Sequence, residues 1–425
     1  MPEEKIDQRL KEALLRAQGV QDKERYASLG LARNPFPFAS ISSPEEVAFL
    51  PPLTENEKEF IEKFLAAPKP AILWISGEYG SGKTHLLLWI RQFITDFGGG
   101  LLAAYYISNP GRSPTELAQQ FMSAVGREDL SHKIRQIVIR RFHNDTRARG
   151  EQQVINEIRL GQGTLYSQEV QHLIEVLVRP DSQVNDVAWL DAARLLFSNW
   201  QGVVSYASRA LMAEGVGVAT VCDELAAFAF ESQGMDEHAW AALIGGKKRG
   251  TSTFEDQFRA LVQVLIASGY RKVFLLIDEM EDLLVSGRLT SRQKTDYLAT
   301  LRILLDESLA QLGVVMAGVE AAWEALKSLY APMKWRTSFR VELPRLNRTV
   351  ATDLVRRYLD RSRVNEGDSI EPFDADAVGA AVKLSEGNRR RFIAICYQAV
   401  EQAAASHSQR VTAAHVATQG ERLPT

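Results

Sequence analysis

The sequence predicts an α/β protein built on a parallel sheet, with a large helical insertion and an α-helical region after the last strand. Two short apolar runs, at 71–75 and 101–107, have the composition of strands buried on both faces, and an amphipathic helical pattern follows each of them, at 83–97 and 114–125. Strands that alternate with helices in this way are typical of parallel sheets. Further strand-like runs return much later in the chain, at 273–277, 313–318 and 339–343.

Two long stretches of the chain lack strands. In the first, helical patterns dominate at 134–142, 168–178, 187–198, 205–213 and 221–230. In the second, four helical segments follow one another at 349–359, 373–384, 388–405 and 412–418. The sequence therefore predicts a core made of 50–125 and 251–346, a helical insertion at 126–250, and a C-terminal helical domain at 347–425, which acts as a lid in the interpretation below.

The N-terminal segment, 1–49, is predicted to hold a charged helical stretch and then an ordered loop. In Asn34-Pro35-Phe36-Pro37-Phe38 each proline drives its predecessor towards extended backbone, so this stretch is not helical. A helix is expected again at 53–64, where Thr54 and Glu57 have the spacing of a capping box.

Composition excludes several classes of protein. Of 425 residues, 45% are hydrophobic and 24% charged, which is ordinary for a folded globular chain. The net charge of −3 excludes a strongly basic body that coats nucleic acid, although it allows a local basic patch. The two cysteines, Cys222 and Cys396, form neither a disulfide framework nor a zinc site. No stretch has the roughly 20 apolar residues of a membrane span, and a cytoplasmic location is expected.

One motif carries most of the chemistry. The run Gly77-Glu78-Tyr79-Gly80-Ser81-Gly82-Lys83-Thr84 fits the pattern G-x-x-x-x-G-K-[ST], and it lies between a buried strand and an amphipathic helix. The glycines let successive backbone N–H groups point at phosphate oxygens, next to the positive end of the helix dipole. Lys83 is expected to reach the β- and γ-phosphates and Thr84 to bind Mg²⁺. His85, which follows directly, is included in the predicted nucleotide site. The alternative is a chance glycine turn.

An acidic pair follows a later buried strand, at Asp278 and Glu279. Asp278 is expected to hold Mg²⁺ and Glu279 to act as a general base on the attacking water. We expect the two halves to meet across adjoining strands. The alternative is a solvated acidic turn, since Glu281 and Asp282 come next. No guanine-recognition motif is apparent, so ATP is the expected nucleotide. This combination predicts the fold of the P-loop NTPases that carry a catalytic glutamate.

These residues resemble those of an AAA+ ATPase of the ORC/Cdc-type initiator clade, and especially the ATP-binding proteins of bacterial defence systems such as BREX. The resemblance covers the Asn34-Pro35-Phe36 segment, both nucleotide motifs, Ile107-Ser108-Asn109, the helical stretch from Tyr297 to Asp306, and the Gly387-Asn388-Arg389-Arg390-Arg391 run. It implies that Asn34 and Phe36 lie near the adenine. It also implies an arginine finger at Arg336 or Arg340, of which Arg336 is favoured. The alternative for either residue is a surface ion pair at the edge of a strand. Arg390 is the implied sensor 2 residue, and Arg389 is the second choice.

The chain also departs from the family pattern. The family usually has a small polar residue at the end of the fourth strand to orient the attacking water, whereas this chain runs Met316-Ala317-Gly318-Val319-Glu320. The leading hypothesis remains an ATP-hydrolysing switch or motor in a DNA transaction, in anti-phage defence, that forms homo-oligomers through its ATP sites. A nucleotide-gated scaffold with little turnover and a target-selecting ATPase of the transposition type are the alternatives.

Partners are predicted from local charge. Basic residues gather at 127–149 (Arg127, Lys133, Arg135, Arg140, Arg141, Arg147 and Arg149) and at 246–250, where phosphate contacts would bind DNA without sequence preference. The alternative is a solvated helix face. Partner proteins are expected on the insertion, and no membrane contact is expected.

Overall fold

The structure is a computed structural model, and it describes residues 25–37, 53, 55–158, 168–178, 186–197, 200–230, 253–305, 311–365, 367 and 369–418. The chain divides into two compact units. The first unit contains Met1–Glu59, Ile75–Ile90 and Val341–Thr425, and the second contains Phe60–Trp74 and Arg91–Arg340.

A five-stranded sheet confirms the predicted α/β class. Its strands are β1 (Ala71–Ser76), β2 (Leu102–Ile107), β3 (Lys272–Ile277), β4 (Leu312–Gly318) and β5 (Thr337–Glu342), in the order β2-β3-β4-β1-β5. Strands β2, β3 and β4 pair in parallel, with Ile107 opposite Ile277 and Ile277 opposite Met316. The order corrects one expectation, because β4 stands between β1 and β3, which are therefore not adjoining strands.

The three central strands of the sheet, β3, β4 and β1, are buried because they are apolar on both faces. Every residue of β1 and β4 is buried, and so are all those of β3 after Lys272. Gly313 makes this packing possible, since a Cβ there would lie 2.7 Å from the ring of Phe274. The surrounding helices are α3 (Glu55–Ala66), α4 (Lys83–Phe97), α5 (Pro114–Val125), α13 (Phe254–Ala267), α14 (Met280–Leu284), α15 (Ser291–Leu305), α16 (Glu320–Leu329) and α17 (Ala331–Arg336). Thr54, the expected cap of α3, lies outside the described residues.

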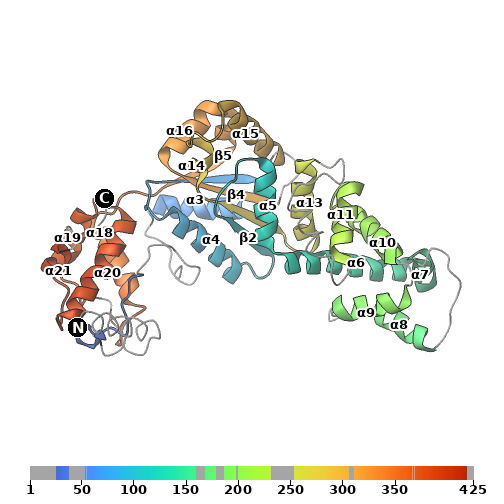
Figure 1. Cartoon of the computed structure of the whole chain (residues 1–425), viewed down its shortest axis with the longest axis horizontal. Coiled ribbons are helices and arrows are strands. Elements are labelled where there is room, and N and C mark those ends of the chain that lie inside the picture. Colours follow the sequence, from blue (N-terminus) through green and yellow to red (C-terminus); the bar gives the residue numbers. More distant parts are fainter. Residues whose placement is uncertain are drawn as a thin grey trace, which may run out of the picture. The chain divides into compact units, whose positions relative to one another are not determined.

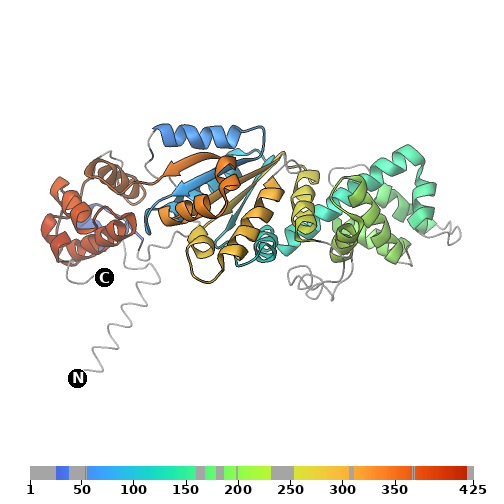
Figure 2. The ribbon, with the colours of Figure 1, turned by 90° about the horizontal axis from the view of Figure 1, so that it is seen from above.

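The insertion is helical throughout its described part. Its helices are α6 (Arg127–Arg149), α7 (Glu151–Ile158), α8 (Gln168–Val178), α9 (Asp186–Leu196), α10 (Trp200–Ala213) and α11 (Ala219–Phe230). In Figures 1 and 2 the long helix α6 runs from α5 to the group formed by α7–α11. Helix α6 is much longer than the predicted 134–142, because it is bounded only by Gly126 and Gly150 and buries residues along its whole length, from Leu130 to Thr146.

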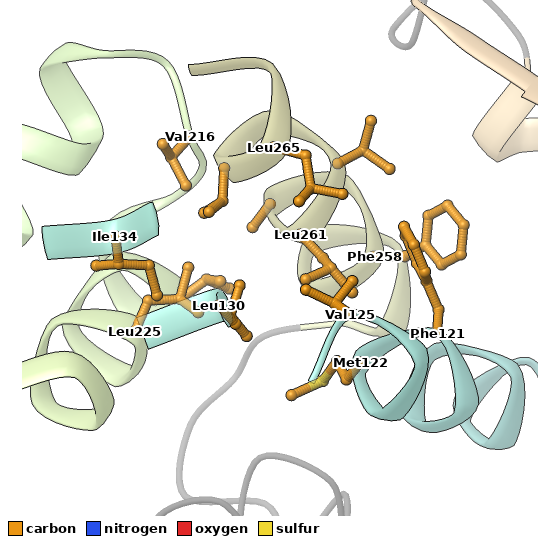
Figure 3. Close-up of a cluster of buried hydrophobic side chains, with 14 of the residues drawn as sticks. Phe121, Met122, Val125, Leu130, Ile134, Val216, Leu225, Phe258, Leu261 and Leu265 are labelled. Carbon is orange, nitrogen blue, oxygen red and sulfur yellow. The ribbon is translucent and has the colours of Figure 1, made fainter. Parts of the chain in front are cut away.

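The insertion shares its core with the helices that flank the sheet. Figure 3 shows side chains of α5, α6, α11 and α13 meeting in one cluster, with Val216 from the α10–α11 loop, namely Phe121, Met122, Val125, Leu130, Ile134, Val216, Leu225, Phe258, Leu261 and Leu265. All ten are buried. Burying large apolar side chains contributes about 1.5–3 kcal/mol each, so these helices are joined by substantial packing.

The first unit is built around four helices at the C-terminal end, α18 (Arg348–Leu359), α19 (Ala375–Leu384), α20 (Arg389–Ala405) and α21 (Ala413–Ala417). The N-terminal segment, including the short 3₁₀ helix η1 (Ala27–Leu29), packs on them. Glu401 of α20 accepts hydrogen bonds from Arg25, Tyr26 and Asn34. None of the helices in the described parts of the chain has the length and apolar character that crossing a bilayer requires.

Candidate nucleotide-binding site

The glycine-rich loop connects β1 to α4 in the first unit, as its sequence predicts. Gly80 and Gly82 have φ values of 75° and 98°, in the left-handed region that favours glycine. A Cβ at Gly77 would lie 2.4 Å from Oγ of Ser81, so the turn leaves no room for a larger residue there. The loop therefore needs its glycines for its shape. Thr84 and His85 occupy the first turn of α4 and are partly buried.

Two buried polar groups of this loop fit a phosphate ligand. The ammonium of Lys83, whose residue is 7% exposed, donates to the carbonyl oxygens of Gly77 at 3.0 Å and Glu78 at 3.2 Å. Ser81 is 6% exposed, and its Oγ has no hydrogen-bond partner among the described residues. Buried hydroxyl groups normally have a partner. An orphaned donor beside a buried cation at a helix N-terminus is what an anion site requires.

The start of α20 and the connection between β5 and α18 contact this loop at three consecutive residues. Asn388, the N-cap of α20, donates from Nδ2 to the carbonyl oxygen of Tyr79 at 2.6 Å. The backbone N–H of Arg390 donates to the carbonyl oxygen of Gly80 at 3.0 Å. The guanidinium of Arg345 binds both carboxylate oxygens of Glu78.

The arginines at the start of α20 are arranged differently from the sequence-based preference. Arg389 is 5% exposed, and its Nη1 would lie 3.5 Å from a Cβ placed on Gly82. Burial lowers the pKa of Arg389 to about 10, an effect that Glu57 partly offsets. Arg390 is exposed, and its backbone N–H donates to the loop. The geometry therefore favours Arg389 over Arg390 as the side chain that faces the loop.

The predicted adenine-side residues have other contacts. Phe36 is 2% exposed and packs against Tyr358 and Phe373, with ring centroids 5.1 Å and 5.7 Å away. The amide of Asn34 donates to the carbonyl oxygen of Tyr397 and to Glu401. Both side chains thus join the N-terminal segment to the C-terminal helices, and their contact with an adenine stays a prediction.

The acidic pair lies in the second unit, where β3 ends. Asp278 is 2% exposed, and its Oδ1 accepts the backbone N–H of Glu279 at 2.9 Å. Its Oδ2 accepts the hydroxyl of Tyr106 at 3.1 Å. Burial of Tyr106, together with the charge of Asp278, raises the pKa of its phenol, so Tyr106 is a stable donor.

Glu279 has the properties of a tuned carboxylate. Its φ of 52° is unusual for a residue with a side chain, and such strain is concentrated at functional sites. Burial raises the pKa of Glu279, and the neighbouring charges of Asp278, Asp282 and Glu281 raise it further. A hydrogen bond from Asn109, which follows β2, lowers it. Asn109 also donates to Oδ2 of Asp282 at 2.6 Å, which fixes the amide beside the pair.

The end of β4 has no small polar side chain, as the sequence indicates. Val319 occupies this place, and its backbone N–H donates to Oε2 of the buried Glu281 at 3.3 Å. Glu320 begins α16 and binds Arg340. Arg340 also lies over the ring of Trp323, 5.4 Å from its centroid. Of the two predicted finger residues, Arg340 is thus held by its own unit, whereas Arg336 is exposed at the end of α17.

Most residues of the predicted basic patch contact other residues of the insertion or of α13. Arg135 donates to the carbonyl oxygen of Ala229, and Arg140 to that of Ala267. Further ion pairs are Lys133 with Asp129, Arg141 with Asp145 and Glu214, and Arg149 with Glu157. The loop at 246–250 lies outside the described residues. A DNA-binding role for 127–149 therefore rests on fewer cations than the sequence suggests.

The contacts of Tyr106 with Asp278 and of Arg345 with Glu78 were not predicted from the sequence, and no motif marks either residue. No group of three or more His, Cys, Asp or Glu side chains that could hold a metal occurs within the described ranges. A metal here would take ligands from a nucleotide as well, which is how Mg²⁺ is usually bound.

Comparison with known proteins gives weak similarities. No protein-family model matches the chain. An uncharacterized HTH-type transcriptional regulator of Methanocaldococcus jannaschii is 27% identical over 85 residues, which cover 20% of this chain and 21% of that protein. The match thus spans about a fifth of the curated relative's length.

The structural neighbours are initiator proteins of the ORC/Cdc6 type. The ORC2 protein of Aeropyrum pernix, in ADPNP–ADP complexes, aligns with 89% of this chain and 71% of its own, at a TM-score of 0.46 and 10% identity. The ORC1 protein of the same organism, in complex with DNA, aligns with 88% of this chain and 66% of its own. Its TM-score is 0.42 and its sequence identity 14%. Cdc6p of Pyrobaculum aerophilum aligns with 86% of this chain and 66% of its own, at a TM-score of 0.39 and 11% identity.

Proposed function

We propose that the protein binds and hydrolyses ATP with Mg²⁺, and that it acts as a nucleotide-dependent switch which assembles into homo-oligomers during a DNA transaction. The observation that carries the proposal is the glycine-shaped loop, which holds the buried ammonium of Lys83 and the orphaned hydroxyl of Ser81 at the N-terminus of α4. This is the arrangement that binds phosphate groups.

Each side chain has a role that follows from its chemistry. Lys83 leaves the carbonyl oxygens of Gly77 and Glu78 to neutralise phosphate oxygens, while Ser81 and the loop amides donate to them. Arg389 adds a second cation from α20. Thr84 and Asp278 are the residues that would hold Mg²⁺, which supplies charge neutralisation when bound. Glu279 accepts a proton from the attacking water, and its raised pKa makes it a stronger base than an ordinary carboxylate.

Two matched variants test this function. Lys83→Ala should abolish binding of a fluorescent ATP analogue, because it removes the cation at the loop. Glu279→Gln should leave binding within about twofold of wild type and reduce phosphate release by roughly 10²–10⁴-fold, the usual contribution of a general base. Lys327→Ala, which alters an ion pair with Glu324 on the exposed side of α16, is the control. Unchanged binding and turnover in both test variants would end the proposal.

A nucleotide-gated scaffold with little turnover is the second candidate, and one observation favours it. Val319 cannot orient water with its side chain, and its N–H is taken by Glu281. If the protein is such a scaffold, the purified protein should contain tightly bound nucleotide, and the rate of phosphate release should not exceed the rate of nucleotide exchange. Single-turnover kinetics compared with nucleotide dissociation distinguish the two.

Oligomer formation and DNA binding belong to the same proposal. Arg336 is the residue that would reach a neighbour's nucleotide, because its side chain is exposed at the end of α17. The molecular mass of the protein in solution should be higher with ATP than with ADP, because ATP is expected to drive oligomer formation. Arg336→Ala should abolish this increase. Repeating the measurement with duplex DNA tests the nucleic-acid partner. A setting in anti-phage defence rests on the sequence resemblance, and protection of cells against phage by the wild-type gene but not the Lys83→Ala variant tests it.

A further inference from the structure

The phosphate loop carries an acid where an anion is expected to bind. Glu78 is the first variable residue of the motif, and both of its carboxylate oxygens are bound by one guanidinium. Nε of Arg345 donates to Oε2 at 3.0 Å, and Nη2 donates to Oε1 at 2.8 Å. Arg345 lies in the short connection between β5 and α18. A bidentate contact of this kind fixes the relative orientation of the two side chains as well as their distance, whereas a single hydrogen bond fixes only the distance.

The same connection is tied to the turn that precedes α20. The backbone N–H of Leu346 donates to the carbonyl oxygen of Gly387 at 2.7 Å, and Nη1 of Arg345 reaches the carbonyl oxygen of Glu386 at 3.5 Å. From this turn, Asn388 and Arg390 bind the next two loop residues, Tyr79 and Gly80. Loop, connection and helix N-terminus therefore form a closed set of contacts, which we call the loop–lid contact (Glu78, Tyr79 and Gly80 with Arg345, Asn388 and Arg390).

Gly80 shows how close this approach is. A Cβ on Gly80 would lie 2.6 Å from Oδ1 of Asn388 and 2.8 Å from Cβ of Arg390. The loop and α20 are thus in direct backbone contact. The contact also fixes Arg389, the residue between the two loop-binding positions, against Gly82.

Fold stability does not explain the ion pair. The side chains of Glu78 and Arg345 are both 59% exposed, and exposed ion pairs contribute little to the free energy of unfolding. Electrostatics at the loop gives a better reason. An unpaired carboxylate beside a polyphosphate would repel it, and it would also compete for Lys83. Arg345 neutralises this carboxylate and holds it in one place.

We propose that Arg345 is a positioning residue that acts on the phosphate loop through Glu78, so that the loop and the C-terminal helices form one preassembled nucleotide-binding body. The inference rests on the proposed function, because it assumes that the loop binds phosphate. It adds that the lid is seated before nucleotide arrives, so that Arg389 is already at the loop. Preassembly lowers the ordering cost of binding.

A double-mutant cycle on nucleotide affinity tests the action through Glu78. Arg345→Gln should weaken binding of a fluorescent ATP analogue by about tenfold, because it leaves the acid unpaired. In a Glu78→Gln background the same change should alter the Kd by less than about twofold. Equal losses in both backgrounds would overturn the proposal, since Arg345 would then act on the ligand directly. Arg345→Lys keeps the positive charge but cannot bind both carboxylate oxygens as a guanidinium does, so its affinity should lie between those of Arg345→Gln and the wild type. Arg348→Gln, an exposed arginine of α18 that binds Asp376, is the matched control.

A measurement without nucleotide keeps the proposal separate from the proposed function. Amide hydrogen exchange at 79–82 and 387–391 should be faster in Arg345→Gln and in Glu78→Gln than in wild type. The charge-swapped variant, Glu78→Arg with Arg345→Glu, should restore slow exchange. If the wild type binds no nucleotide, the proposed function fails while this measurement still reports on the contact. If exchange at the loop does not change in Arg345→Gln, the preassembled body does not exist.

Discussion

Tyr106 of β2 donates its hydroxyl to Oδ2 of Asp278, the residue that follows β3, over 3.1 Å. The parallel register sets this contact, because Ile107 and Ile277 lie opposite each other at the ends of the two strands. The other oxygen of Asp278 accepts the N–H of Glu279. Both oxygens are thus oriented by protein donors in a carboxylate that is 2% exposed, which resembles the outer-sphere support of metal ligands.

The first prediction concerns this support. Tyr106→Phe should weaken Mg²⁺ binding to the nucleotide complex by about tenfold, the lower end of the effect seen when such supporting partners are removed. Nucleotide affinity without Mg²⁺ should not change, because Tyr106 does not belong to the loop. Titration of Mg²⁺ against the signal of a bound fluorescent nucleotide measures both. Tyr105→Phe is the control, since its hydroxyl is directed to Tyr270. Equal Mg²⁺ affinity in Tyr106→Phe and wild type would contradict the supporting role.

The second prediction concerns pH. A base acts when deprotonated, and the pKa of Glu279 is raised by burial and by three neighbouring acids. The rate of ATP hydrolysis should therefore decline on the acid side at a pH above the ordinary carboxyl value of 4.5. Asn109→Ala removes the hydrogen bond that lowers this pKa, so the decline should move to higher pH. A profile that moves to lower pH, or does not move, would show that Glu279 is not the titrating base.

The stability of the fold should report the same group with a defined sign. Because the folded-state pKa of Glu279 lies above 4.5, the folded protein binds this proton more tightly than the unfolded chain. At a pH above the folded-state pKa, the charged carboxylate lowers the free energy of unfolding. This loss disappears as the pH falls to the pKa of Glu279 in the unfolded chain, where the group is protonated in both states. Glu279→Gln should therefore raise the Tm at pH 7, and the difference should shrink towards pH 4. Thermal unfolding across this range measures it.

The third prediction distinguishes two adjacent arginines. Arg389→Ala should weaken nucleotide binding by about tenfold or more, because a cation held in a low-dielectric place interacts strongly with phosphate. Arg390→Ala should have less than about a twofold effect, since Arg390 contributes its backbone N–H to Gly80. Equilibrium binding of the same fluorescent nucleotide compares them. A larger loss in Arg390→Ala would restore the sequence-based assignment.

Local signals made the strands and the phosphate loop predictable. Buried strands such as β3 and β4 are continuous apolar runs, and the loop's glycines have a fixed spacing. Neither feature depends on a distant part of the chain. The choice between Arg389 and Arg390 does, because it depends on where α20 begins. Asn388 caps that helix by accepting the N–H of Arg391, and one residue of helix turns a side chain by about 100°.

Residues whose role depends on strand register or on a distant partner could not be predicted. Tyr105 and Tyr106 are adjacent and chemically alike, and only the pairing of β2 with β3 decides which one reaches Asp278. Arg345 has no motif, and its partner Glu78 lies far away in the sequence. The contacts that the basic residues of α6 make within the protein could not be predicted for the same reason, since many of their partners come from other helices.

The fourth prediction tests this last point with Arg135, which sequence analysis placed in a DNA-binding patch. Its Nε donates to the carbonyl oxygen of Ala229 at 2.8 Å, and its Nη1 lies 3.5 Å from Oδ2 of Asp186, a residue that is 9% exposed. The guanidinium thus joins α6 to the last turn of α11 and to the start of α9. Arg135→Gln leaves a buried carboxylate whose remaining ion-pair partner among the described residues is His132, and should lower the free energy of unfolding by about 1–3 kcal/mol.

Arg147 is the matched comparison, because it is exposed in the last turn of the same helix. Arg147→Gln should leave the Tm unchanged. If α6 contacts DNA, the same change should make binding less dependent on salt by about one phosphate contact. Arg135→Gln, measured below its unfolding transition, should retain the wild-type salt dependence. Thermal unfolding and salt titrations of duplex binding, made on both variants, decide the matter. A loss of DNA affinity in Arg135→Gln with an unchanged Tm would mean that Arg135 faces the nucleic acid and that its contacts to Ala229 and Asp186 are incidental.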